Sequence, residues 1–343
     1  MTEPTTTIVP PGPNRRSRIV RRILGLLVTA IALYLVFPSL VEVLSSWDEV
    51  ADLEPLWLVV VLGCQVASFA CLWALQRLAL RTTAWLPVIT SQLAGNAASR
   101  VIPGGAATGT AVQYRMLRTA GIGTANAASG LAATGFLQIG IICAIPLVAL
   151  PGVLLGAPAP QALLNATWLG AALFVLVALL AAWVIRDERP LRVIGTAIDR
   201  IRTRLGRSHD DDLADRLLVE RNLIRTELGS QWGTTLTLAI GRAAFDYLTL
   251  LTALAAFDVN ARASLVLLAY ATSALLTMVP LTPGGLGFVE AGLSATLILA
   301  GVPPTTAASV ALLYRLASFW LPIPTGLVAA AVHRHRYRPE PAR

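Results

Sequence analysis

The chain has 343 residues, of which 55% are hydrophobic and only 13% are charged, and its mean hydropathy is +0.68. This composition excludes an ordinary soluble domain and predicts an all-α, polytopic membrane helical bundle. All 27 basic residues are arginine, and the formal net charge is +8. Because the arginines lie mostly at the ends of apolar runs, they fit the cytoplasmic excess of basic residues rather than a nucleic-acid-binding face.

The residues that usually carry metal or nucleophile chemistry are sparse. The three cysteines fall inside apolar runs, and the three histidines lie in polar segments without the spacing of a metal motif. The absence of lysine also excludes a P-loop, whose lysine contacts the nucleotide phosphates. We therefore expect no cofactor, no metal and no enzymatic activity, and we expect any transport to be independent of ATP hydrolysis by this chain.

The N-terminal part predicts a cytoplasmic start. Residues 1–18 are rich in Thr, Pro and Arg and are expected to be disordered. An apolar run at about 23–41 follows the arginines, and the acidic loop after it contains no basic residue, as expected for the outer face. A second run at about 56–76 returns the chain to the cytoplasm.

Residues 84–121 do not form one clean span. Pro103-Gly104-Gly105 interrupts this segment, and arginines flank it on both sides. Proline removes a backbone donor and glycine loosens a helix, so the chain should break here. In hydrocarbon, broken backbone survives only inside protein or beside a wet cavity. We therefore predict a re-entrant hairpin that enters and leaves by the cytoplasmic face.

The rest of the chain repeats this organisation after a polar interruption. Ten arginines and nine acidic residues lie between Arg186 and Glu227, so residues 186–232 predict a cytoplasmic linker. The remaining predicted parts are spans at about 124–150, 163–185, 233–256 and 305–332, a second hairpin at 264–302, and a cytoplasmic tail at 333–343.

Together these parts predict a transmembrane domain over residues 19–332, with about six full spans and two hairpins. Residues 56–150 form one unit, and residues 233–332 form a second unit of opposite orientation. Pro103-Gly104-Gly105 and Pro283-Gly284-Gly285 fall at corresponding points of the two units. Paired broken segments in an inverted repeat are typical of a transporter site near the bilayer midplane.

The second break lies in the stretch from Pro280 to Glu290, which carries two prolines, three glycines and a carboxylate. Thr282 is placed to act as N-cap, and Pro283 as a first-turn residue, of a half-helix that runs through Glu290. The free N–H groups and positive end of such a half-helix suit a phosphate or another anion. Packing kinks are the structural alternative, because Gly and Pro are common in membrane helices.

Charged residues inside the apolar runs complete the candidate site. Glu290 and Arg315 are expected to pair, either as a structural ion pair or with a direct substrate role. Arg242 and Asp246 are four residues apart and could form a structural pair on one helix face. The candidate substrate-binding residues are Arg100, Pro103, Gly104, Gly105, Arg115, Thr282, Pro283, Gly284, Gly285, Gly287, Glu290 and Arg315.

These motifs resemble those of a known family. Asn96, Pro103-Gly104-Gly105, the stretch Pro280–Glu290 and Tyr314-Arg315-Leu316 look like the transmembrane domain of lysylphosphatidylglycerol synthases, also called the flippase-like family. In that family a Gly-Glu pair often follows the first motif, whereas here Gly109-Thr110 stands in its place. The resemblance therefore implies no functional glutamate after the first motif of this chain.

The resemblance implies a lipid transporter, which we expect in a bacterial plasma membrane. The arginines at the ends of the first and last apolar runs predict that both termini are cytoplasmic. The partner of the transporter would be a membrane lipid with an anionic or aminoacylated headgroup, of the phospholipid or polyprenyl-phosphate type. The alternative is a non-transporting accessory subunit of an envelope-biosynthesis enzyme that modifies glycolipid or lipid. The soluble aminoacyl-transfer domain of the full synthases has no counterpart in the sequence, so synthase activity is not expected.

Overall fold

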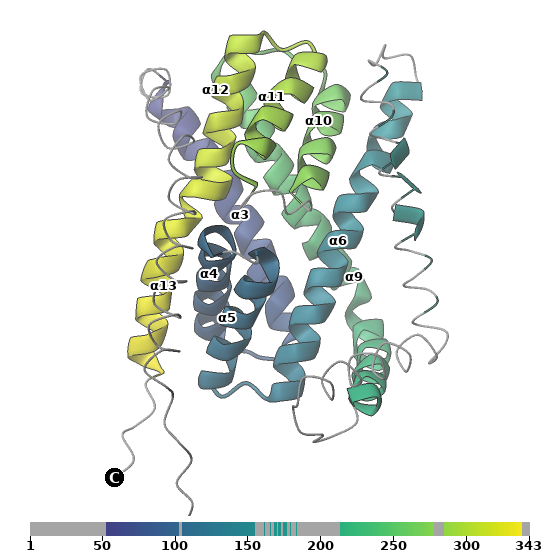
Figure 1. Ribbon diagram of the computed structural model, residues 1–343, viewed down its shortest axis with the longest axis vertical. Helices are drawn as coiled ribbons and strands as arrows, with labels where there is room; N and C mark the ends of the chain where they lie inside the picture. The colour runs from purple at the N-terminus through teal and green to yellow at the C-terminus, as the bar shows by residue number, and fades with distance from the viewer. Residues whose placement is uncertain are drawn as a thin grey trace, which may run out of the picture.

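A computed structural model describes residues 53–102, 105–154, 213–277 and 285–337, together with single positions between 161 and 183 (Figure 1). Every regular element in these ranges is a helix. The elements, in chain order, are α3 (Pro55–Ala79), α4 (Trp85–Val101), α5 (Gly105–Thr119), α6 (Thr124–Leu154), α9 (Leu213–Ala256), α10 (Ala263–Leu276), α11 (Phe288–Leu299), α12 (Pro304–Arg315), the π-helix η2 (Leu316–Trp320) and α13 (Pro322–Arg336).

Four helices are long and apolar enough to cross a membrane: residues 55–79, 124–148, 231–256 and 304–336. They confirm four of the six predicted spans. Their outward faces expose large apolar side chains such as Val59, Phe136 and Val328, as expected where lipid replaces water. The predicted span 23–41 and the N-terminal segment lie outside the described residues, as do most of the span 163–185 and part of the linker.

Both segments predicted to be broken are pairs of short helices. α4 packs on α5, and α10 packs on α11. In Figure 1 the adjoining ends of α4 and α5 lie towards the middle of the bundle from one side, and those of α10 and α11 lie towards it from the other. α10 and α11 contain 14 and 12 residues. A helix of about 20 residues is needed to cross the hydrocarbon, so neither arm spans it alone.

Helices from the two halves of the chain pack against each other in a reciprocal pattern. α3 contacts α9, α4 contacts α13, and α6 contacts α10. In each of the last two pairs, the final helix of one half lies against the first arm of the other half's hairpin.

Glycines allow the closest of these approaches. A Cβ on Gly326 of α13 would lie 2.4 Å from the Leu93 carbonyl oxygen of α4, and one on Gly109 of α5 would lie 2.5 Å from the Gly95 carbonyl oxygen of α4. Small residues at helix interfaces in membranes serve this purpose, because dispersion and polar contacts replace the hydrophobic effect there. The α4–α5 hairpin is therefore held by backbone packing on both sides.

A buried histidine fixes the C-terminal end of α13. His333 is 3% exposed, and its Nδ1 lies 2.8 Å from the Thr90 hydroxyl of α4. Its Nε2 lies 2.9 Å from the Met116 carbonyl oxygen of α5. α13 continues to Arg336, past the boundary predicted for the C-terminal tail.

The start of α11 differs from the prediction. Thr282 and Pro283 were expected to begin this half-helix, but it begins at Phe288 with Gly287 as its N-cap. Gly285 and Gly287 have φ values of 73° and 75°, which a right-handed helix cannot contain. The α-helix therefore cannot include Gly285 or Gly287 and begins only after them. Residues 278–284, with Thr282, Pro283 and Gly284, lie outside the described residues, as do Pro103 and Gly104.

Candidate functional site

The predicted pairing of Glu290 with Arg315 is confirmed. Arg315 Nε donates a hydrogen bond of 2.8 Å to Glu290 Oε1, and each residue is 5% exposed. Glu290 occupies the first turn of α11, where the helix dipole favours a negative charge, and Arg315 is the last residue of α12. The pair therefore joins the second hairpin to the long C-terminal helix.

The other carboxylate oxygen of this pair is not satisfied. Glu290 Oε2 is buried and has no hydrogen-bond partner among the residues that the structure describes. An unpaired oxygen of a buried carboxylate is costly, because the desolvation of that atom is not compensated. Glu290 thus holds one oxygen on Arg315 and keeps the second available for a proton or a donor from a ligand.

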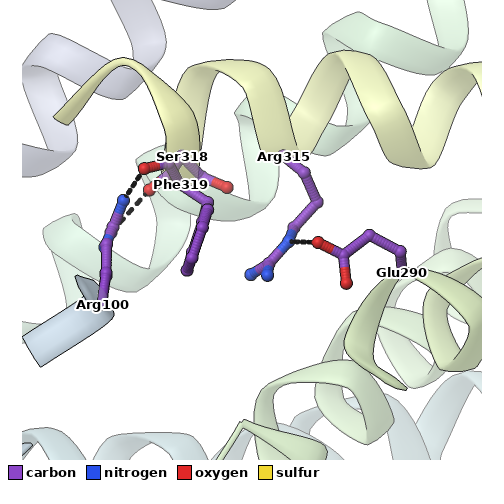
Figure 2. Close-up of polar contacts among 5 residues, drawn as sticks. All are labelled: Arg100, Glu290, Arg315, Ser318 and Phe319. Carbon is purple, nitrogen blue, oxygen red and sulfur yellow. Dashed lines mark hydrogen bonds and ion pairs between the residues drawn. The ribbon is translucent and has the colours of Figure 1, made fainter. Parts of the chain in front are cut away.

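Arg100 approaches the same helix from the first hairpin (Figure 2). Its Nη2 donates a hydrogen bond of 2.7 Å to the Ser318 carbonyl oxygen, and its Nη1 donates a short hydrogen bond to the Phe319 carbonyl oxygen. Arg100 lies in the last turn of α4, directly before the break at Pro103. The sequence placed Arg100 near the site, and the structure shows that it binds backbone of the opposite half.

The sequence explains why the Ser318 carbonyl group accepts a hydrogen bond from a side chain. Pro322 has no N–H, so the Ser318 carbonyl four residues earlier lacks its α-helical donor. The helix widens here into η2, in which Leu321 N–H donates to the Leu316 carbonyl oxygen at 2.9 Å. Such π-helical turns are often found at functional sites. Arg100 therefore satisfies the Ser318 carbonyl, which the proline leaves without its helical donor, and also binds the neighbouring Phe319 carbonyl.

Phe319 separates the two arginines. The guanidinium carbon of Arg315 lies 4.1 Å from the Phe319 ring centroid, and that of Arg100 lies 4.7 Å from it. Figure 2 shows the ring between the two guanidinium groups. Cation–π attraction to the ring partly offsets the repulsion between like charges. Arg100, Glu290, Arg315 and Phe319 form one unit, which we call the central charged cluster.

A second polar group lies next to this cluster along α12. Asp246 of α9 accepts hydrogen bonds of 2.8 Å from the Tyr270 hydroxyl and of 2.9 Å from the Tyr314 hydroxyl. These contacts connect α9, α10 and α12. The predicted pairing of Asp246 with Arg242 is wrong: no ion pair joins them among the described residues, because Asp246 Oδ2 accepts from the two tyrosines instead.

The remaining described candidates are not brought into the cluster. Arg115 is exposed on α5 and makes no hydrogen bond or ion pair within the described part of the chain. Gly105, Gly285 and Gly287 have positive φ, so their role in the turns is conformational. Beside Gly105 and Gly287 there is open space, whereas a Cβ on Gly285 would meet Val289.

Ser318, Phe319, Tyr270 and Tyr314 were not among the predicted site residues. One signal could have revealed Ser318: a proline four residues after a position inside an apolar helix marks an unpaired carbonyl. No group of three metal-binding side chains occurs in the ranges that the structure describes.

The comparison with known families agrees with this architecture. Residues 22–326 match the family described as the lysylphosphatidylglycerol synthase TM region. The chain belongs to this family. No curated protein matches the chain. The family and the spanning helices identify an integral membrane protein related to lipid.

Proposed function

We propose that this member of the family is a lipid transporter, which moves a lipid with an anionic or aminoacylated headgroup between membrane leaflets. The observation that carries the proposal is the central charged cluster, in which three ionised side chains lie where helices from both halves of the chain meet. Intramembrane charge is expensive and is usually retained for function.

The balance of charge favours an anionic headgroup. In the described parts of the spans and hairpin arms, the charges near the cluster are Arg100, Arg242 and Arg315 against Asp246 and Glu290. The excess is one positive charge, and guanidinium groups bind phosphate in a planar, bidentate geometry. The lipid phosphate would therefore bind beside the Arg315 guanidinium, near the N-terminal end of α11, with Arg100 on the other side of the Phe319 ring adding to the positive field.

Glu290 would control the availability of Arg315. As a carboxylate it occupies Arg315 Nε, and its free Oε2 is the atom that would accept a proton. Protonation would weaken the ion pair, release Arg315 to the lipid phosphate, and couple lipid movement to a proton. The neutral side chain would still be able to donate a hydrogen bond to the headgroup.

The reciprocal packing supports an inverted repeat. α3 with α9, α4 with α13, and α6 with α10 are the contacts that a two-fold axis in the membrane plane would generate. We propose that both units contribute one hairpin to a site near the midplane, within a domain of about six spans. The arginine-rich ends of α3, α5 and α13 would face the cytoplasm of a bacterial cell, with both termini on that side.

A reconstituted leaflet-exchange assay tests the function. Purified protein in liposomes is offered labelled phosphatidylglycerol, its lysyl and alanyl derivatives, and a polyprenyl-phosphate lipid. Wild-type protein should exchange one of these lipids, and Glu290→Ala should reduce the rate to that of protein-free liposomes. Glu54→Ala is the matched control, because Glu54 is an exposed carboxylate without a capping hydrogen bond.

Failure of folded wild-type protein to exchange any of the four lipids would contradict the proposal. It would favour the accessory subunit, whose partner would be an enzyme of envelope biosynthesis. Copurification of such an enzyme through the linker at 186–232 would then be the next measurement.

A further inference from the structure

A second site lies at the arginine-rich end of the bundle. A pocket of about 350 Å³ opens where α3 ends, α6 begins and the spanning part of α9 begins. Its volume falls in the range of small-molecule sites, which are typically about 300–1,000 Å³. Because three spanning helices end or begin here, the pocket lies at the level where apolar side chains give way to polar ones.

The pocket wall is basic and rich in hydroxyl groups. Arg77 and Arg81 line it, together with Thr82, Ser129 and Thr235, and no carboxylate is among its described lining residues. Arg77 is held in position from outside the pocket, because its guanidinium carbon lies 4.0 Å from the ring centroid of Trp85. A wall of cationic and hydroxyl donors without acidic residues suits an oxyanion.

Thr235 provides an independent indication of a ligand. It is 3% exposed, yet its hydroxyl has no hydrogen-bond partner within the described ranges of the chain. Other threonines of α9 donate to the carbonyl four residues earlier, as Thr237 does to Gly233 at 2.8 Å and Thr249 does to Phe245 at 2.9 Å. For Thr235 that residue is Gln231, where α9 is kinked with φ −119° and ψ 20°. The kink thus accompanies a buried, unpaired hydroxyl on a residue that lines the pocket.

We infer that this pocket binds a phosphate group, with Arg77 binding its negative charge and the Thr235 hydroxyl donating a hydrogen bond to one oxygen. The phosphate could belong to a lipid headgroup that enters from the membrane or to a water-soluble phosphate ester. The site is separate from the central charged cluster and shares no residue with it. The inference therefore does not depend on the proposed transport activity.

Binding measurements on the full chain in neutral detergent distinguish the two sources. One arm titrates dioleoyl phosphatidylglycerol and counts bound lipid by native mass spectrometry, and the other titrates glycerol 3-phosphate by calorimetry. Saturable binding in the lipid arm alone would identify a headgroup site, and binding in the second arm would identify a soluble ester. Either result supports the inference if it depends on the pocket residues.

That dependence is tested with matched variants. Arg77→Gln should weaken binding by about 10-fold or more, and Thr235→Val by about 5-fold, because each removes one donor to a charged group. Arg334→Gln, an exposed arginine on α13, and Thr237→Val, whose hydroxyl is already bonded within the helix, should bind like wild type.

Absence of binding in both arms would overturn the inference. So would equal affinities of wild type, Arg77→Gln and Thr235→Val, provided that circular dichroism shows all three to be folded. Glu290→Ala should leave binding at this pocket unchanged. A failure of this inference can therefore be distinguished from a failure of the proposed transport function.

Discussion

The two hairpins occupy equivalent places in the two halves of the chain, but different interactions hold them. The α4–α5 hairpin is fixed by backbone contact, with Gly95 and Gly109 facing each other and Gly326 pressed against its first arm. The α10–α11 hairpin packs through core side chains such as Leu293 and Leu297, and it carries in addition a buried ion pair, because Glu290 binds Arg315 on α12. Close packing has one arrangement, whereas an ion pair can exchange partners. We therefore expect the second hairpin to be the part that responds to substrate.

The largest effect on stability should come from separating the buried pair. Arg315→Gln leaves Glu290 buried without its cation and should lower the free energy of unfolding by about 3–5 kcal/mol. The double variant Glu290→Gln/Arg315→Gln removes both charges and should recover most of that loss. Thermal unfolding of the purified variants in detergent measures both values. A double variant no more stable than Arg315→Gln would contradict the pairing.

The second largest effect on stability should come from breaking the contact between Arg100 of α4 and the carbonyl groups of η2. Arg100→Gln removes charge-assisted hydrogen bonds to the Ser318 and Phe319 carbonyl groups and should cost about 1.5–3 kcal/mol. Pro322→Ala restores the missing N–H, so the Ser318 carbonyl regains a helical donor. In the Pro322→Ala background, Arg100→Gln should therefore cost less. Equal costs in both backgrounds, measured by the same unfolding assay, would contradict this explanation.

Because the helices of the first hairpin are closely packed, replacing a glycine between them by alanine should lower the stability of the protein, by less than the loss of Arg315 does. The added methyl of Gly109→Ala would lie 2.5 Å from the Gly95 carbonyl oxygen and 2.7 Å from Ser99 Cβ, so it should destabilise the protein by about 1–3 kcal/mol. Gly140→Ala in α6 is the control, because nothing lies within 4 Å of its added Cβ, and it should be neutral or slightly stabilising. Equal melting temperatures for the two variants would argue against close packing.

The smallest effect is expected where α4 meets the end of α13. Thr90→Val removes the hydroxyl that contacts His333 Nδ1 and should cost about 0.5–1.5 kcal/mol. Thr110→Val, at an exposed position whose hydroxyl bonds only within its own helix, should change stability less. Hydrogen exchange of α13 would show whether the loss is local to this contact, and unchanged exchange would count against it.

Much of this architecture follows from sequence, because a membrane restricts the choices. Apolar runs of sufficient length predicted four helices correctly, and the Pro-Gly motifs marked both breaks. The pairing of Glu290 with Arg315 was predictable because two opposite buried charges rarely remain apart. The start of α11 could not be predicted. Three glycines allow several backbone conformations, and only packing selects the positive φ values of Gly285 and Gly287.

The partners of Arg100 and Asp246 could not be predicted by the same arguments. Local spacing favoured Arg242 for Asp246, but Tyr270 and Tyr314 reach it from helices distant in the sequence. Arg100 binds carbonyl groups more than 200 residues away along the chain. Such contacts depend on how α4, α9, α10 and the α12–α13 helix are arranged, which a single sequence does not specify.

The most direct test of the central claim is the exchange rate of phosphatidylglycerol or its aminoacyl derivatives by Glu290→Gln/Arg315→Gln in liposomes. This variant should be nearly as stable as wild type, so a structural role of the pair would leave transport intact. Our account predicts that exchange falls to the protein-free rate, because the headgroup loses its cation and the carboxylate that controls it. Exchange at the wild-type rate by the folded double variant would contradict the account and leave the pair a purely structural element.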